Sequence, residues 1–106
     1  FHKMDVSDAE GIAALVRAHG ITRVIHLAAQ AGVRYSIDNP FAYQKSNLAG
    51  HLAIIEACRH AKGFVHLVYA SSSSVYGDKP MGGNGFTEDE PAASPVSLYA
   101  ATKRSC

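Results

Sequence analysis

Two short apolar runs most constrain how this chain of 106 residues can fold. Residues 23–29 (RVIHLAA) and residues 64–70 (FVHLVYA) are rich in β-branched and aromatic side chains, and polar segments flank both runs. Runs of this length and composition are typical of parallel strands that are buried on both faces. We therefore expect two such strands within an α/β sheet.

Helical patterns alternate with these strands. Residues 7–19 carry apolar side chains at helical spacing after a Ser/Asp start, and Gly20 marks the end of that helix. A loop is expected up to Asn39, and Pro40 then begins a longer helix that reaches about Ala61. The apolar stripe of this second helix comprises Leu48, Leu52 and Ile55. The alternation predicts an α/β fold with a doubly wound parallel sheet of the Rossmann type.

Composition narrows the classes of partner. Hydrophobic residues make up 47% and charged residues 18%, and the formal net charge is +1 with both signs interspersed. We therefore expect no nucleic-acid partner and no membrane partner. The two cysteines, Cys58 and Cys106, suit a reducing compartment and show no metal-ligand spacing. These features predict a cytoplasmic protein without a metal site.

Tyr99 and Lys103 are the first candidates for chemistry. Four residues apart on a helix, they lie on one face, and the positive charge of the lysine favours the ionised phenol that a general base requires. The pair alone is weak evidence, because two surface residues on a helix give the same pattern. Ser71–Ser74 strengthen it, since they follow a predicted strand at the end where open α/β sheets bind ligands. Hydroxyls that satisfy their own backbone are the alternative interpretation of these serines.

Several other residues favour structural roles. His26 and His66 lie within the apolar runs and are expected to be hydrogen-bonded core histidines. Cys58 is expected to be a small packing residue on its helix. The stretch Gly82–Gly85 does not lead from a strand into a helix, so it predicts a flexible loop rather than a phosphate-binding turn.

Four strings together resemble the extended short-chain dehydrogenase/reductase family of NAD-dependent epimerases and dehydratases. They are HLAAQAGVRYS (26–36), SNLAG (46–50), VYASSSSVYG (68–77) and PVSLYAATK (95–103). The resemblance covers almost the whole chain and is greatest to the UDP-glucuronate 4-epimerases, for which QAGVRYS and SSSSVYG are typical. It implies NAD as the cofactor and a nucleotide sugar as the substrate.

The resemblance also implies roles for individual residues. Tyr99 corresponds to the base that takes the proton of the sugar hydroxyl, Lys103 to the lysine that holds the nicotinamide ribose, and Ser72 to the third catalytic residue. Cofactor contacts are implied for Asp5, Val6, Ala28, Ala29, Gln30, Asn47, Tyr99 and Lys103.

Ser72, Ser73 and Ser74 are implied near the sugar. Arg34 is a further candidate, because a guanidinium can bind a carboxylate through two hydrogen bonds; a surface arginine is the equal alternative.

We interpret residues 1–106 as part of an NAD(P)-binding Rossmann domain, from the end of its third strand to the start of the helix with Tyr99 and Lys103. The predicted activity is 4-epimerisation of UDP-glucuronate by oxidation, rotation and re-reduction at C4, in a homodimeric parent enzyme. A 4,6-dehydratase or decarboxylase of the same family, or a catalytically silent NAD-binding regulatory module, are the alternatives. Because the glycine-rich pyrophosphate turn and a substrate domain are missing from this fragment, we expect the isolated chain to be inactive and to bind NAD weakly or not at all.

Overall fold

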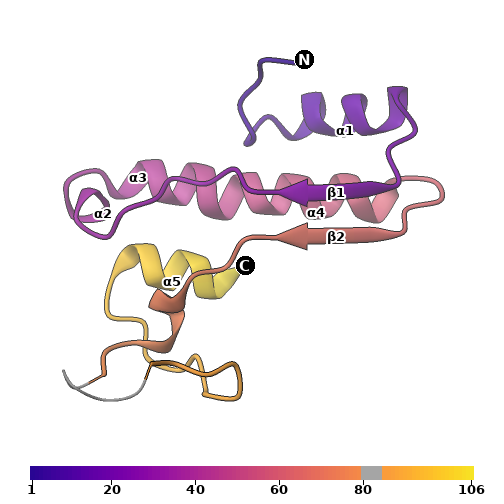
Figure 1. The fold of residues 1–106 in the computed structure, drawn as a ribbon. Coiled ribbons are helices and arrows are strands. Elements are labelled where there is room, and N and C mark those ends of the chain that lie inside the picture. Colours follow the sequence, from indigo (N-terminus) through magenta and orange to yellow (C-terminus); the bar gives the residue numbers. More distant parts are fainter. Residues whose placement is uncertain (80–84) are drawn as a thin grey trace.

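The computed structural model describes residues 1–79 and 85–106, and its helices and parallel strands follow the predicted order (Figure 1). The elements are α1 (Ala9–Ala18), β1 (Arg23–His26), α2 (Tyr35–Asp38), α3 (Pro40–Tyr43), the π-helical segment η1 (Gln44–Ala49), α4 (Gly50–His60), β2 (His66–Tyr69), the 3₁₀ turn η2 (Ser73–Tyr76) and α5 (Leu98–Ser105). The α/β prediction is confirmed.

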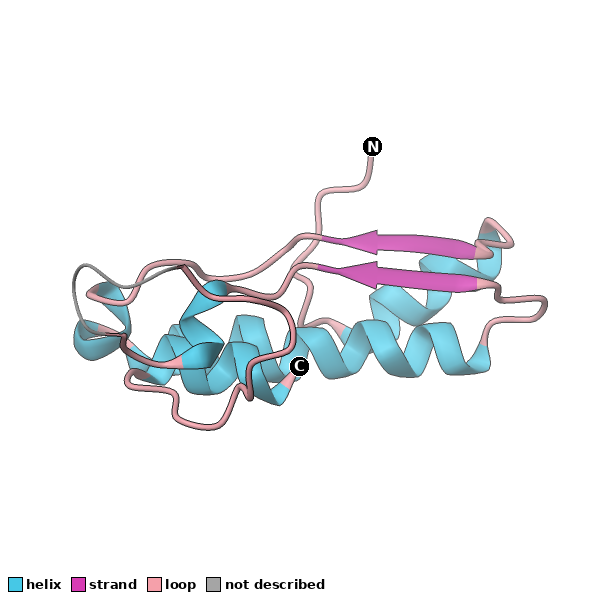
Figure 2. Cartoon of the chain, turned by 60° about the horizontal axis from the view of Figure 1, so that its bottom comes forward, coloured by secondary structure: helices cyan, strands magenta, loops and turns pink. Residues whose placement is uncertain are grey.

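The two strands pair in parallel, in a register that runs from Arg23 opposite His66 to His26 opposite Tyr69. Both are shorter than the apolar runs that predicted them. Figure 2 shows the helices gathered on one side of the strands. The other face of the sheet is open, so the expectation that both faces are buried is wrong for this structure.

The exposed fractions of the strand side chains show that helices cover only one face of the sheet. Ile25 is 74% exposed and Val68 is 47% exposed, whereas His26 is 8% exposed on the covered side. His66 is exposed, so its predicted role as a core histidine is wrong. Successive residues of a strand point to opposite faces, and only the face toward the helices has partners here.

The first helix begins and ends where its sequence predicts. Asp8 caps it, because the Oδ1 atom of Asp8 accepts a hydrogen bond of 3.0 Å from the backbone N–H of Gly11. Ile12 and Val16 then face α4 and pack against Ala57 in a small core. Burial of two such side chains stabilises the pairing of α1 with α4 by roughly 1.5–3 kcal/mol each. Cys58 is buried on α4, as expected of a packing residue.

The second helix differs from its prediction in two ways. Pro40 does occupy the first turn, and the helix ends at His60. The preceding segment, expected to be a loop, forms the short helix α2, and the helix itself is interrupted by the π-helical segment η1. Segments of this kind are rare and occur frequently at functional sites.

The buried face of this helix is also rotated from the predicted one. Tyr43, Asn47 and His51 are 0%, 2% and 5% exposed, whereas Leu48 is 37% and Leu52 59% exposed. The apolar stripe is therefore not the core stripe. Two polar side chains occupy the buried face because the site described below provides partners for the Asn47 amide and aromatic contacts for the His51 ring.

The last helix starts as the sequence predicts. The Oγ atom of Ser97 accepts a hydrogen bond of 3.0 Å from the backbone N–H of Ala100 and so caps α5. The predicted flexible glycine stretch falls largely outside the described residues, since 82–84 are not described. In the parts of the chain that are described, no helix is both long enough and apolar enough to cross a lipid bilayer.

Gly50 gives the first testable prediction. A Cβ atom at this position would lie 2.6 Å from the Cγ1 atom of Val6, a stiff β-branched side chain. Although alanine favours a helix over glycine, we expect Gly50→Ala to lower the free energy of unfolding by about 1 kcal/mol or more, because overpacking costs about 1–3 kcal/mol. Urea denaturation measures this. Val6→Ala combined with Gly50→Ala should recover most of the loss, and a stabilised single variant would contradict the contact.

Candidate functional site

The candidate site lies where β1 and β2 end side by side. Because the strands are parallel, their carboxyl ends meet at one edge of the sheet, and α5 packs below that edge (Figure 1). Ligands bind at this edge in open α/β sheets. The loops that follow the strands carry most of the residues that the sequence selects.

Lys103 reaches the end of β2 from α5. Its side chain is buried, and its Nζ atom donates a hydrogen bond of 2.8 Å to the backbone carbonyl of Ala70. The N–H of Ala70 in turn donates to the carbonyl of His26, 3.2 Å away, at the end of β1. The ammonium is thus anchored to a peptide that is itself fixed between the two strands.

Tyr99 lies one turn before Lys103 on α5 and is half-buried. Its ring meets that of Tyr43 edge to face, with centroids 6.1 Å apart and planes at 79°. The Tyr43 hydroxyl donates to the carbonyl of Ala31 at 2.8 Å, and burial raises the pKa of this phenol. Tyr43 therefore couples the loop after β1 to the ring of Tyr99. Sequence reasoning missed Tyr43, although its place four residues before Asn47 on one helix was a usable signal.

The serine cluster forms the 3₁₀ turn η2. Ser72 caps it: its Oγ atom accepts a hydrogen bond from the backbone N–H of Ser74 at 3.2 Å and donates to the Oγ atom of Ser74 at 3.2 Å. The hydroxyl predicted to be catalytic therefore already has partners within its own turn, as the alternative interpretation of the serines expects. Ser73 is exposed and Ser74 is half-buried.

A hollow of about 300 Å³ lies beside this turn. It is lined by Val33, Ser73, Ser74, Gly77, Asp78, Phe86, Val96 and Ser97. Two of the three predicted substrate serines therefore face one cavity. Arg34 is exposed at the start of α2, and its neighbour Val33 rather than Arg34 lines the hollow.

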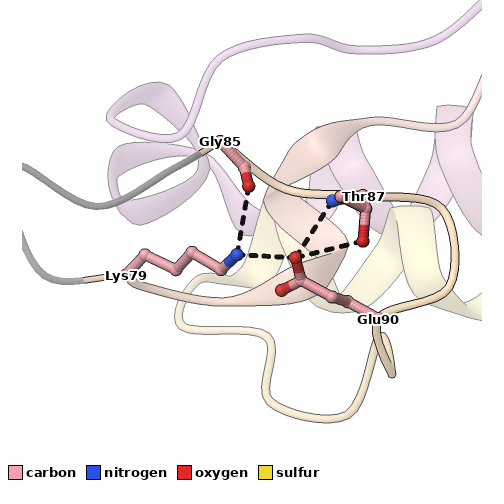
Figure 3. A network of polar contacts seen from close by, with 4 residues as sticks. All are labelled: Lys79, Gly85, Thr87 and Glu90. Carbon is pink, nitrogen blue, oxygen red and sulfur yellow. Dashed lines mark hydrogen bonds and ion pairs between the residues drawn. The ribbon is translucent and has the colours of Figure 1, made fainter.

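Lys79 directly follows Asp78, which lines the hollow, and forms an ion pair with Glu90 (Figure 3). The Nζ atom of Lys79 lies 2.6 Å from the Oε1 atom of Glu90, which also accepts the backbone N–H of Thr87 at 3.0 Å. The ammonium lies 4.8 Å from the ring centroid of Phe86, and that ring stacks on Tyr76. The hydrogen bond from Lys79 is the main cause that lowers the pKa of Glu90. These contacts position the Phe86 ring, which lines the same hollow as Ser73 and Ser74.

Asn47 joins the loop after β1 to α5. Its Oδ1 atom accepts the N–H of Gln30 at 2.8 Å, and its Nδ2 atom donates to the carbonyl of Gln30 at 3.0 Å. The same Nδ2 donates to the Oγ1 atom of Thr102 at 3.0 Å, and Thr102 donates to the carbonyl of Tyr99 at 2.8 Å. These contacts position the loop after β1 and the helix, and the predicted contact of Asn47 with a cofactor stays a prediction.

The remaining predicted cofactor contacts are spread along the edge. Asp5 is exposed, and its carboxylate accepts hydrogen bonds from Lys45 at 2.7 Å and from Ser7. The bond from Lys45 is the main cause that holds the pKa of Asp5 far below its usual range. No strand is formed at Asp5, which begins a turn that its carbonyl closes by accepting the N–H of Asp8 at 3.0 Å. Val6 is half-buried against Gly50, and Ala28 and Ala29 follow β1 directly.

This arrangement can support proton transfer next to a fixed positive charge. A phenol and an ammonium lie on one helix at the ligand-binding edge, and peptide groups of residues 28–30 lie across from them on the neighbouring strand end. The further N–H groups of the Lys103 ammonium suit ribose hydroxyls and the peptide groups of Ala28 and Ala29 suit an amide, so the residues present fit a nicotinamide cofactor. Within the described residues, no three His, Cys, Asp or Glu side chains gather as metal ligands.

Comparison with protein families and curated proteins matches this picture. Residues 1–106 match the model of a family described as GDP-mannose 4,6 dehydratase. UDP-glucuronate 4-epimerase 1 of Arabidopsis thaliana is 46% identical over 102 residues, which are 94% of this chain and 23% of that protein.

Solved structures share the fold. UDP-glucose 4-epimerase of Thermus thermophilus, in complex with NAD, has a TM-score of 0.84 and 38% identity over 96% of this chain and 32% of that one. DesIV of Streptomyces venezuelae, a dTDP-glucose 4,6-dehydratase with NAD and DAU bound, has a TM-score of 0.82 and 30% identity over 95% of this chain and 30% of that one. The chain therefore spans about a third or less of these relatives.

Asn47 gives the second testable prediction. Asn47→Ala removes the partner of both the N–H and the carbonyl of Gln30, and it leaves the Thr102 hydroxyl with only its bond to Tyr99. Unsatisfied buried groups cost about 1–3 kcal/mol each. We expect the variant to lose roughly 2–4 kcal/mol in the free energy of unfolding, by urea denaturation. Gln44→Ala on the exposed side of the same helix is the matched control and should change it by less than about 0.5 kcal/mol. Equal effects of the two substitutions would refute the bridge.

Proposed function

Because the chain belongs to the GDP-mannose 4,6 dehydratase family of NAD-dependent epimerases and dehydratases, we propose that the protein containing it is an NAD-dependent nucleotide-sugar 4-epimerase. The main support for this proposal is the position of Lys103, whose ammonium is bonded to the carbonyl of Ala70 at the end of β2. Lys103 lies one turn from Tyr99 on α5. In this proposal residues 1–106 are part of its NAD(P)-binding Rossmann domain.

Bound NAD supplies a reversible acceptor for the hydride of the sugar C4 carbon. The chain's own residues provide the rest of the site. Tyr99 takes the proton of the O4 hydroxyl and returns it, and Lys103 donates to the nicotinamide ribose. Ala28, Ala29 and Gln30 offer peptide groups along the cofactor, and Asp5 with Val6 lies toward its adenine end. Asn47 fixes the peptide of Gln30 for this purpose.

Ser72 completes the catalytic group in the proposal, although its hydroxyl also caps η2. Rotation about its Cα–Cβ bond exchanges the contact with Ser74 for one with the sugar. Ser73 and Ser74 then face the sugar from the hollow, which Phe86 also lines. Arg34, exposed beside this hollow, is assigned to an anionic group at its rim.

UDP-glucuronate is the proposed substrate. It is the substrate named for the Arabidopsis relative, and small hydroxyls can hold a carboxylate without filling the cavity. Oxidation of a uronic acid at C4 gives a β-keto acid, which loses CO₂ readily. An epimerase must therefore hold the carboxylate away from the cleaving orientation, which is the task given to Ser73, Ser74 and Arg34.

A 4,6-dehydratase is the second candidate, favoured by the structural likeness to DesIV. Elimination of water across C5 and C6 requires an additional acid and base near the sugar. Ser73 and Ser74 occupy the described turn beside the hollow, and neither can serve as that acid and base at neutral pH. The serines therefore favour the epimerase.

The third testable prediction concerns activity. The full-length protein, assayed with UDP-glucuronate, should form UDP-galacturonate without net production of NADH. Tyr99→Phe should lower kcat by about 10²-fold or more, because general base catalysis contributes 10²–10⁴-fold. Tyr35→Phe keeps the ring that contacts Tyr43 and removes only an exposed hydroxyl bonded to Asn39, so it should leave kcat unchanged.

Each other product identifies a different enzyme. A UDP-pentose as the main product indicates a decarboxylase, and a 4-keto-6-deoxy sugar indicates a dehydratase. Full function in Tyr99→Phe would indicate a catalytically silent regulatory module. Any of these results would overturn the epimerase proposal.

The proposal includes a cytoplasmic homodimer. Leu48 and Leu52 form an apolar face on the α3–α4 helix, and a hollow of about 120 Å³ continues this face to the end of α5. A second copy of the chain that packs on these helices would bury them. Apolar faces of this kind mark interaction sites in soluble proteins.

Sedimentation velocity tests this fourth prediction. The full-length protein should sediment as a dimer, and Leu52→Glu should shift it toward the monomer because the interface would have to bury a carboxylate. Ile37→Glu, a charge placed on the exposed α2 helix, is the control and should leave the dimer intact. A wild-type monomer, or a dimer that tolerates Leu52→Glu, would contradict this interface.

A further inference from the structure

Two histidines lie buried beside Lys103, and the proposed reaction uses neither. His26 is 8% exposed, His51 is 5% exposed and Lys103 is 8% exposed. The two imidazole rings stack, with centroids 5.3 Å apart and planes at 28°. His26 on β1, His51 on α4 and Lys103 on α5 thus form one buried cluster of nitrogen-bearing side chains below the edge of the sheet.

The rings pack against the strands that carry the lysine's anchor. His51 meets Tyr69 edge to face, with centroids 4.8 Å apart and planes at 66°. Tyr69 directly precedes Ala70, whose carbonyl accepts the ammonium of Lys103. His26 supplies the carbonyl that fixes the Ala70 N–H. A shift of either ring is therefore passed to the peptide on which Lys103 rests.

The electrostatics of the pair depend on its being neutral. Burial is the main cause that lowers the pKa of His26 and of His51, and the charge of Lys103 lowers both further. The backbone of Cys106 acts in the opposite direction on the pKa of His51. The other titratable groups facing the pair are the phenol of Tyr69 on β2 and the thiol of Cys106 at the end of α5. Burial raises the pKa of the Cys106 thiol, which therefore offers no negative charge to offset an imidazolium.

One atom of the pair is unusual. The Nε2 atom of His51 is a buried polar side-chain atom with no hydrogen-bond partner among the described residues. An unsatisfied buried nitrogen costs stability, so packing alone is better served by an apolar aromatic ring. Position 51 thus carries an imidazole, although an apolar ring would cost less stability there. This imidazole lies near the ammonium of Lys103.

We propose that the stacked rings of His26 and His51 are positioning residues for Lys103. When both rings are neutral, they support the Ala70 peptide, and within this cluster only Lys103 carries a positive charge. A proton on either ring introduces a second positive charge, which repels Lys103 from the Ala70 carbonyl. The proposal rests on the proposed function, because the position of Lys103 matters through its contact with cofactor and its effect on Tyr99.

The pH profile of the full-length enzyme tests this. In the wild type, kcat/KM should fall by about tenfold for each pH unit below the pKa of the pair, since only the neutral pair is productive. His51→Phe keeps an aromatic ring without a proton site, and its acid limb should move to lower pH because one of two coupled sites is gone. His26→Phe combined with His51→Phe should lose this limb. His51→Gln is a second non-titrating variant, in case the larger ring disturbs folding.

His60→Phe is the matched control. His60 lies on the same helix but is exposed, and it pairs with Glu56 rather than with Lys103. Its removal should leave the acid limb where it is in the wild type. An unchanged acid limb in both His51 variants would overturn the proposal and leave the rings a packing role only.

A second measurement does not depend on turnover. The ¹³Cε resonance of Lys103 should show a titration step at the pH where His26 and His51 titrate, and the step should disappear in the double variant. If the protein turns over none of the tested sugars but this step is present, the proposed function fails and the link between the histidines and Lys103 stands. If turnover is found and the step is absent, the link fails and the epimerase stands.

Discussion

The buried amide of Asn47 joins the two halves of the candidate site. Its oxygen and its two N–H groups are satisfied by the peptide of Gln30 and by Thr102, which passes the connection to the carbonyl of Tyr99. A fully satisfied polar network in a low-dielectric interior is rigid, because each group would lose a strong hydrogen bond on moving. The π-helical segment Gln44–Ala49 carries this amide, and it changes the face to which the side chain points. The loop after β1 and the helix that carries Tyr99 and Lys103 therefore hold one relative position.

Sequence patterns a few residues long predicted where the helices begin, but they did not predict which face of the sheet is buried. The caps at Asp8 and Ser97 depend on a side chain and a backbone N–H three residues apart, so a short stretch of sequence contains all the information. Burial of Ile25 and His66 depends on what lies across the sheet, which the strand's own sequence does not specify. Apolar strands were predicted correctly as strands and incorrectly as buried on both faces. The residues that fail are those whose environment is set by distant segments.

The same distinction applies to the site. Tyr99 and Lys103 were selected by their spacing together with the serine-bearing strand end and the family resemblance, and the structure places both on α5, one turn apart. Their roles in catalysis stay a prediction. Tyr43 and His51 were missed because hydrophobic patterning selects leucines and treats a phenol or an imidazole as a surface residue. Here the polar side chains are inside and Leu52 is outside, because the interior offers them a carbonyl and an aromatic ring as partners. Buried polar residues are predictable only when their partners are known, and those partners lie on other elements.

Lys103 differs from Lys45 and Lys79 in the kind of group that its ammonium contacts. Lys45 and Lys79 each lie within 2.7 Å of a carboxylate oxygen, at Asp5 and Glu90, so their charges are largely compensated. Lys103 is more deeply buried than either, yet its hydrogen bond goes to a neutral carbonyl. A carboxylate in that place would lower the cost of burial and would also cancel the field that a neighbouring phenol or an anionic ligand could use. The carbonyl fixes the position of the ammonium without neutralising it. A buried charge kept uncompensated at the ligand-binding edge of a parallel sheet is costly for the fold alone, and its position suits the chemistry of a proton-abstracting tyrosine.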